Sequence, residues 1–538
     1  MDDETVRSVT EAVENAVKYC TAAVEQAVTK VTSGFESSAG AIEGDAQNIS
    51  SRVQSILESA NEDVEGGLKS TIVASCKRVP SGGWFLLSLG MAGMLIARGE
   101  KKRCGKSPHP SICHCIQLQP PAFYFDQPLK NRRFCAQDIF DVEAAITSFG
   151  SPHWEKTHEA ATKTAFVLDT LKKRGATCIA KTVMDELGFS LVGRNRWFET
   201  PKNPFAIYRI CGGSSSGAAV SVANEIAEFA IGIDTVGDIR VPAACCGVLG
   251  FRASHGAISM AGIIPVASSC DALGWFARNA DLLLLVGRQL CTPHSEADGS
   301  GPKRFYMARD VFKLSCLPHS GTADIMSRSV ERTIGRLSLH DIELLDHFKF
   351  NMPAIQTFKK ELDRMNIESS QYTTLDVLRE SMLLFHRHEF KTNHGEWVAK
   401  VKPQLTCTVE ARVERAVFTP SSAALRSIAG KVREELRTVM DTLLKDDALL
   451  VVPVLPCLPP KLDAPIDELE IFEYQTHALM SIATISGCCQ VVIPVGSYGC
   501  PIVEEDSRNI PSEGAAQMWS VRPVPATEYV LTARPFYL

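Results

Sequence analysis

Two neighbouring segments carry the strongest structural signal in this chain: GGSSSGAAVSVA at residues 212–223 and GIDTVGDIRVPAACCG at residues 232–247. In the first segment, glycines allow unusual backbone angles and a close approach of the main chain to a ligand, and serines directly precede a run of small residues that fits a helix. A Gly-Ser loop by itself also fits an ordinary linker. Its neighbours in the sequence therefore decide how it is interpreted.

The segments around this loop alternate between short apolar runs and helical patterns. FCAQDIFDV at residues 134–142 and EIAEFAIGID at residues 225–234 have the composition of strands, and the stretch at residues 157–186 contains a helical pattern. This alternation predicts an α/β domain with helices packed on a mostly parallel or mixed sheet. In such a domain the loops carry the chemistry.

The composition narrows the classes of function. The chain has 538 residues, 45% of them hydrophobic, and a net charge of -6. That charge provides no general attraction for nucleic acid or anionic lipid. The 18 cysteines are scattered through apolar segments, which is typical of reduced, mostly buried thiols in a protein that faces the cytosol.

The region before the α/β pattern divides into three parts. Residues 1–81 form an extension in which a valine-rich stripe at residues 6–31 predicts an amphipathic helix and an acidic stretch follows. Residues 82–97 carry no charge and are followed by a basic cluster. As a helix this run would rise about 24 Å, which is short for a bilayer, so a buried core helix is the alternative. The nearly continuous apolar character and the basic flank favour a transmembrane anchor with the C-terminal bulk in the cytosol.

Residues 98–128 are expected to form a linker that contains proline and cysteine. Thiolate and imidazole groups in this stretch are of the types that bind zinc, but their spacing matches no paired-knuckle pattern, so no metal site is predicted. The side chains concerned are Cys104, His109, Cys113, His114 and Cys115.

Taken in order, GGSSSGAAVSVA and the stretch at residues 230–278 resemble the signature region of the amidase signature family. The resemblance implies an amidase-type fold over residues 129–500, with a twisted mixed central sheet covered by helices on both faces. It also implies a catalytic triad of lysine, cis-serine and serine. In that triad a neutral lysine takes a proton through the bridging serine, the second serine attacks the amide carbonyl, and backbone amides of a glycine-rich turn hold the oxyanion.

The triad positions can be carried over one at a time. Ser214 matches the bridging serine, Asp238 stands where the family has its nucleophile, and Gln137 stands where the family has its lysine. Lys181 matches a different family lysine, which is not the base. The equivalents of the oxyanion turn are Thr235, Val236 and Gly237, and the Gly-Ser loop contributes Gly212, Gly213, Ser215 and Ser216.

Two of these three triad positions lack the required chemistry. The amide of Gln137 is not basic enough to accept a proton near neutral pH. A carboxylate at Asp238 would place negative charge beside the developing oxyanion. We therefore expect a pseudoenzyme that does not hydrolyse amides. In a non-catalytic alternative, Asp238 forms an ion pair with Arg240 as i and i+2 residues of a strand, and Ser214, Ser215 and Ser216 cap the following helix.

Within the family, segments such as QDIFDVEAAITSFGSPHWEKTHEAA (residues 137–161) and the run at residues 82–97 resemble the plant sixty-four-kilodalton outer envelope protein group. This resemblance implies a location on a chloroplast or mitochondrion outer membrane, an accessory role in docking precursor proteins for protein import, and no cofactor. The group's tetratricopeptide repeats, which dock chaperones, do not follow residue 500.

Residues 501–538 are instead expected to form a divergent tail of low structure, which would leave the sheet without its last strands. Two alternatives to the import role remain open. One is an active amidase that acts on small amides such as indole-3-acetamide. The other is a truncated product with no function of its own.

Overall fold

The computed structural model describes residues 109–121, 126–291, 304–315, 322–333, 338–446, 448–499 and 523–533. The chain divides into two units, residues 1–102 and 103–538, and every described residue belongs to the second. The predicted N-terminal helix and the predicted anchor at residues 82–97 lie outside the described residues. Among the helices that are described, none is both long enough and apolar enough to cross a membrane.

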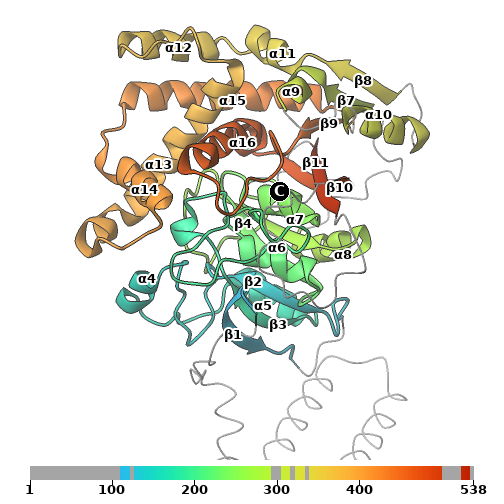
Figure 1. Ribbon diagram of the computed structural model, residues 1–538, viewed down its shortest axis with the longest axis vertical. Coiled ribbons are helices and arrows are strands. Elements are labelled where there is room, and N and C mark those ends of the chain that lie inside the picture. Colours follow the sequence, from blue (N-terminus) through green and yellow to red (C-terminus); the bar gives the residue numbers. More distant parts are fainter. Residues whose placement is uncertain are drawn as a thin grey trace, which may run out of the picture. The chain divides into compact units, whose positions relative to one another are not determined.

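One mixed sheet of 11 strands organises the described part of the chain, in the order β1-β3-β2-β4-β6-β5-β10-β11-β9-β7-β8 (Figure 1). β2 runs parallel to β3 and β4, and β7 runs parallel to β8 and β9, whereas the remaining pairs are antiparallel. The strands are β1 Ile112–Leu118, β2 Arg133–Gln137, β3 Thr177–Thr182, β4 Phe229–Asp234, β5 Leu249–Arg252, β6 Ala272–Ala277, β7 Arg304–Ala308, β8 Leu339–Ile342, β9 Ala448–Pro453, β10 Cys489–Gly499 and β11 Pro523–Ala533.

Helices follow the strands along the chain. They are α4 Pro152–Thr157, α5 Phe166–Lys173, α6 Ser216–Ala223, α7 Arg240–Cys246, α8 Ala280–Leu290, α9 Arg309–Lys313, α10 Thr322–Thr333, α11 Leu344–Asn351, α12 Ala354–Arg364, α13 Thr374–Val401, α14 Cys407–Phe418, α15 Ala423–Leu443 and α16 Ile466–Ser486, with a 3₁₀ turn at Glu186–Gly188. α13 packs against α14, α15 and α16, which Figure 1 shows as one group. α13 begins with a capping box in which Thr373 and Asp376 satisfy each other's backbone amides.

The sheet separates two hydrophobic cores because successive side chains of a strand point to opposite faces. In β2, Phe134 and Ala136 belong to one core and Cys135 to the other. α5 and α8 contribute apolar side chains to the core that contains Phe134. α6 and α7 contribute to the core that contains Cys135. Both faces of the sheet are therefore covered by helices, as the sequence predicted.

The structure corrects two expectations about the flanks of the domain. The stretch at residues 98–128 was expected to be a linker, but residues 112–118 form β1, which pairs with β3 at one edge of the sheet. The stretch at residues 501–538 was expected to have low structure, but residues 523–533 form β11, which lies inside the sheet between β10 and β9. The β-branched and aromatic residues of ATEYVLTA favour a strand, a signal that the prolines just before it obscured.

The cysteines in the described part of the chain form no disulfide with one another, and most of them are buried. Burial raises the pKa of Cys135 to about 12, so this thiol stays protonated near neutral pH and packs as a small apolar side chain.

Candidate functional site

The three triad-equivalent positions come together at the carboxyl ends of two adjacent strands. β2 ends at Gln137, and β4, which runs parallel to it, ends at Asp234 just before the turn that contains Asp238. Gln137 Nε2 donates to Ser214 Oγ over 3.3 Å, and Gln137 Oε1 accepts from the backbone N–H of Ile233 over 3.0 Å. All three triad-equivalent side chains are buried. Gln137 and Asp238 both contact Ser214, so the three positions lie next to one another.

The Gly-Ser loop brings Ser214 next to Gln137 because its glycines fit where other residues would not. Gly212 has a φ of +75°, and a Cβ on it would come within 2.9 Å of the Pro242 backbone. A Cβ on Gly213 would come within 2.6 Å of the Asp185 carboxylate. The peptide bond between Gly213 and Ser214 is cis.

The serines of this loop do not cap the helix in the predicted way. Ser215 is the residue before α6, but its side chain makes no capping hydrogen bond. Its hydroxyl donates to the Ile233 carbonyl, and the Ser216 hydroxyl donates to the Val183 carbonyl. Both hydroxyls therefore link the loop to neighbouring segments of the fold.

The Asp238 carboxylate accepts hydrogen bonds from the turn that, by the family resemblance, would hold an oxyanion. Its Oδ2 accepts the backbone N–H groups of Thr235 and Val236 over 2.8 and 2.9 Å, and its Oδ1 accepts the N–H of Ser214 over 3.3 Å. Gly237, at a φ of +133°, lets the turn pass Met480, because a Cβ there would come within 2.7 Å of the methionine side chain. The backbone donors of the turn are thus already occupied by a negatively charged group of the chain itself.

The environment of Asp238 opposes its ionisation. Burial and the nearby negative charge of Asp234 raise the pKa of Asp238 to about 6, although hydrogen bonds from Val236, Ser214 and Thr235 act in the opposite direction. Near neutral pH a carboxylate with this pKa is mainly ionised. An amide substrate would therefore meet a full negative charge where its transition state needs hydrogen-bond donors.

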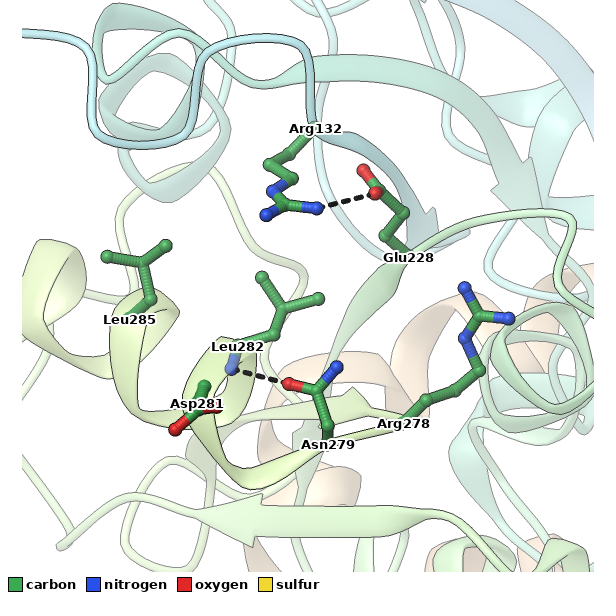
Figure 2. Close-up of a pocket in the computed structure, with 7 residues that line it drawn as sticks. All are labelled: Arg132, Glu228, Arg278, Asn279, Asp281, Leu282 and Leu285. Atoms are coloured by element: carbon green, nitrogen blue, oxygen red, sulfur yellow. Dashed lines mark hydrogen bonds and ion pairs between the residues drawn. The ribbon is translucent and has the colours of Figure 1, made fainter.

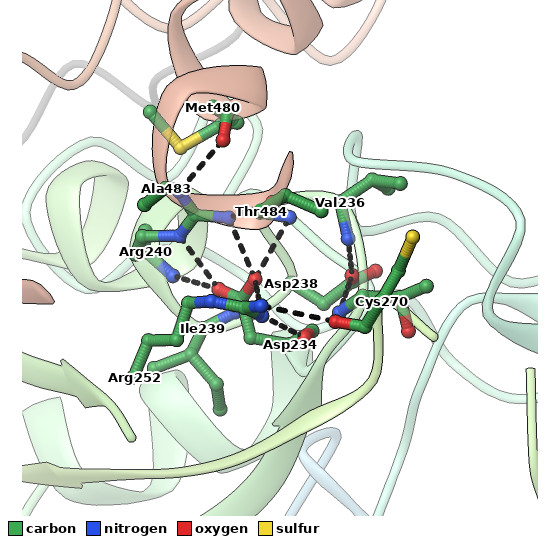
Figure 3. A network of polar contacts seen from close by, with 12 residues as sticks. Asp234, Val236, Asp238, Ile239, Arg240, Arg252, Cys270, Met480, Ala483 and Thr484 are labelled. Carbon is green, nitrogen blue, oxygen red and sulfur yellow. Dashed lines mark hydrogen bonds and ion pairs between the residues drawn. The ribbon is translucent and has the colours of Figure 1, made fainter. Parts of the chain in front are cut away.

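Arg240 pairs with Asp234, so the predicted ion pair between Asp238 and Arg240 is wrong (Figure 3). Arg240 Nη2 lies 2.7 Å from Asp234 Oδ1, and Arg252 Nη1 lies 2.9 Å from the same oxygen. The prediction treated residues 238 and 240 as part of one strand, but α7 begins at Arg240, and Asp234 accepts the N–H groups of Ile239 and Arg240. Burial opposes ionisation of Asp234, yet the two guanidinium groups hold its pKa below the ordinary value.

These contacts define what the site can do chemically. Ser214 has the Gln137 amide as its hydrogen-bond partner, and an amide is not basic enough to accept a proton near neutral pH. The Asp238 carboxylate accepts three backbone hydrogen bonds. The site therefore brings together an amide, a hydroxyl and a carboxylate, none of which is an amine.

Sequence reasoning missed a second polar cluster on the other side of β2. Asp138 Oδ1 lies 2.5 Å from Lys181 Nζ, and Asp138 Oδ2 accepts from the Ser148 hydroxyl and lies 3.4 Å from His114 Nε2. Burial opposes ionisation of Asp138, but Lys181 and His114 hold its pKa well below the ordinary value. Lys181 is therefore fixed by an ion pair with Asp138.

Cys113, His114 and Asp138 have potential ligand atoms within 4.8 Å of one another. Both Asp138 oxygens already have partners, and the Lys181 ammonium supplies the positive charge that a metal ion would bring. The cluster is accounted for as an ion-paired network. The short apolar stretch ICHCIQL at residues 112–118 could have signalled a strand, but not the pairing of that strand with β3, which places His114 beside Lys181.

Figure 2 shows a pocket of about 280 Å³ that lies away from these positions. Arg132 lines it just before β2 begins, whereas Gln137 stands at the other end of that strand. Arg132 pairs with Glu228, and Arg278 pairs with Glu225. Arg132 and Arg278 are both paired with glutamates of the chain, so they give no reason to expect a ligand in this pocket.

Comparison with known proteins finds similarity to amidases and to an outer envelope protein. A family model described as Amidase matches residues 127–504. The chain is 40% identical over 425 residues to "Outer envelope protein 64, chloroplastic" of Arabidopsis thaliana, which covers 78% of this chain and 71% of that protein. It is 41% identical over 385 residues to "Amidase 1" of Arabidopsis thaliana, which covers 71% of this chain and 90% of that protein.

A solved structure titled "Crystal structure of amidase" superposes with a TM-score of 0.57 at 21% identity, covering 76% of this chain and 81% of that one. At this identity the likeness concerns the fold alone.

Proposed function

The chain belongs to the amidase family, and we propose that it is a non-catalytic member with an accessory role in docking precursor proteins for import. In this proposal residues 82–97 anchor it in the outer membrane of a plastid or a mitochondrion, and the bulk of the chain faces the cytosol. The similarity to an outer envelope protein supports the location. The import role is supported by 38% identity over 421 residues to "Translocon at the outer membrane of chloroplasts 64" of Pisum sativum. The proposal includes precursor proteins or import components as partners, and no cofactor.

The non-catalytic part of the proposal rests on the hydrogen bonds that the Asp238 carboxylate accepts. The carboxylate occupies the N–H groups of Thr235 and Val236, which in the family's mechanism would be free to bind an oxyanion. Gln137 adds a second loss, since its side chain contacts Ser214 but offers no basic nitrogen. Loss of one oxyanion donor alone typically lowers turnover by about a hundredfold to a thousandfold. The two changes together leave no route for proton transfer and attack.

The test is amide hydrolysis over a panel of small amides, with the natural chain beside the variant Gln137→Lys/Asp238→Ser. We expect no hydrolysis by the natural chain and measurable hydrolysis by the double variant. A lysine at position 137 would lie close to Ser214, because the Gln137 side chain already contacts it. Adding Ser214→Ala to the double variant should abolish that activity. Hydrolysis by the natural chain that disappears in its own Ser214→Ala variant would overturn the proposal.

One observation favours a second candidate, an active amidase that acts on small amides such as indole-3-acetamide. The chain matches a relative named "Amidase 1" at 41% identity across 90% of that protein. Similarity of this degree concerns the shared fold as much as the reaction, and Asp238 and Gln137 argue against the reaction. The same amide panel decides between the two candidates.

A further inference from the structure

The first half of α16 presents large apolar side chains to solvent. Ile466, Ile471 and Tyr474 are 51%, 58% and 46% exposed. Spacings of three to five residues place them along one side of the helix, whereas Leu469 and Phe472 between them are buried in the core. Asp467 and Glu470 are exposed on the same side of the helix, so this side combines large apolar side chains with negative charge.

A loop next to the segment that leads into α16 exposes three further large apolar side chains. Phe205, Ile207 and Tyr208 are 40%, 58% and 42% exposed. The loop is fixed to the segment that leads into α16, because the Leu462 N–H donates to the Tyr208 carbonyl over 2.8 Å and Arg209 forms a β-bridge with Lys461. We call the surface formed by Phe205, Ile207, Tyr208, Ile466, Ile471 and Tyr474 the α16 face.

Tyr474 is held in place within the α16 face. Its hydroxyl donates to Asp376 Oδ1 over 2.7 Å, and the Arg379 guanidinium lies 3.2 Å from the centre of its ring. A ring fixed in this way loses little side-chain entropy when a partner covers it. Exposed aromatic side chains of this kind commonly anchor protein interfaces.

Negative charge exceeds positive charge in the segments that form the α16 face. Asp463, Asp467, Glu468 and Glu470 are exposed, against two exposed lysines, Lys202 and Lys461. Opposite charges across an interface favour association, and like charges disfavour it. The face therefore complements a partner that combines apolar side chains with positive charge.

We infer that the α16 face docks a basic amphipathic segment of a partner protein, with the partner's apolar side against Ile471 and Tyr474 and its basic side toward Asp463 and Glu470. This inference rests on the proposed import role and names the chemistry of the segment that the chain would receive. Organelle targeting segments are amphipathic, rich in arginine and poor in acidic residues. An amphipathic helix laid against an apolar surface is also a common mode of peptide recognition.

The test uses the purified full chain and a fluorescent peptide that forms an amphipathic helix with leucine on one face and arginine on the other. Binding is measured by fluorescence anisotropy, together with a scrambled peptide of the same composition. We expect the amphipathic peptide to bind at least about tenfold more tightly than the scrambled one, because only the former can bury an apolar face. Higher salt should weaken the binding.

Two variants probe the charged and the apolar parts of the face. Asp463→Lys/Glu470→Lys reverses two charges outside the first turn of α16, so the favourable acidic residues at its N-terminus remain. Ile471→Ser removes an exposed apolar side chain. Each variant should weaken binding of the amphipathic peptide by about tenfold.

Matched controls separate the face from general charge and surface effects. Glu396→Lys/Glu434→Lys makes the same change of charge at exposed positions on α13 and α15, and Phe350→Ser removes an 82% exposed side chain of α11. These controls should bind like the natural chain. Absence of binding, equal binding of the scrambled peptide, or equal losses in the controls would each overturn the inference.

The import role is tested separately, so that the two failures can be told apart. Organelles that carry either the Asp463→Lys/Glu470→Lys chain or its charge-matched control are compared for the rate of precursor import. Slower import with the face variant supports both proposals. Peptide binding at the face without any change in import would leave the docking surface standing and contradict the proposed function.

Discussion

Asp238 shows how a single side chain can occupy the backbone donors of a turn within an intact fold. A serine in this position would leave the N–H groups of Thr235 and Val236 free, whereas the carboxylate accepts both. These two N–H groups are therefore satisfied without any substrate, which favours the conformation of the turn. At the scale of the residue, the proposed loss of hydrolysis and the hydrogen bonding of the turn have the same cause.

The raised pKa of Asp238 predicts a pH-dependent stability. The native pKa of about 6 lies above the ordinary 3.8, so the native state binds the proton more tightly than the unfolded chain. The stability from this group is fully present below about pH 4 and is lost as the pH rises through about 6. Asp238→Asn keeps an acceptor oxygen but removes the titration.

The measurement is urea unfolding of the natural chain and Asp238→Asn across this pH range. The free energy of unfolding of the natural chain, relative to the variant, should fall by about 2 kcal/mol between pH 4 and pH 7. Other titrating groups are common to both chains and cancel in the difference. A difference that stays level across this range would contradict the raised pKa.

The limits of sequence reasoning are clear at individual residues. The resemblance to the amidase signature region predicted that Gln137, Ser214 and Asp238 lie in one site, because the parts of that motif occur in the same order along this chain. The partner of Arg240 did not, because the choice between Asp234 and Asp238 depends on where β4 ends and α7 begins. The contact between His114 and Asp138 depends on the pairing of β1 with β3, across an interval that no local pattern spans.

At the scale of elements, the sheet is held together by a strand from the end of the described chain. β11 pairs with β10 along its length and with β9 through residues 529–532, so it connects the half of the sheet that carries the candidate site to the half formed by β9, β7 and β8. The alternating pattern predicted the α/β class and its mixed sheet. It did not reveal β11, because a strand's place in the sheet is set by pairing with distant residues.

Removal of β11 should therefore damage the whole domain. In a chain that ends after Arg522, the edges of β10 and β9 that face β11 would have no partner strand. Exposed strand edges of this kind promote aggregation. We expect this chain to elute as aggregates in size-exclusion chromatography and to lack a cooperative thermal transition. A chain that ends after Ala533, which keeps β11, should be monodisperse and melt cooperatively. Equal behaviour of the two chains would show that β11 is dispensable.

At the scale of the whole molecule, we propose that residues 82–97 attach an inactive amidase-type domain to a membrane. The run at residues 82–97 has no charged residue and is followed by a basic cluster, so it should hold a fused protein on a membrane. A fluorescent protein fused to residues 60–110 should remain with membranes after alkaline extraction. A fusion in which two leucines of the run, Leu86 and Leu87, are changed to Lys should appear in the soluble fraction. Release of the unaltered fusion would contradict the anchor.

The seat of Asp238 also has an evolutionary consequence. A reversion at position 238 alone yields a serine with no base behind it, and a reversion at position 137 alone places a lysine close to a buried carboxylate through their shared neighbour Ser214. Under the proposed non-catalytic role, neither change alone would restore hydrolysis, because the first leaves Ser214 without a base and the second leaves the carboxylate on the backbone donors of the turn. Hydrolysis would then require both changes in the same chain.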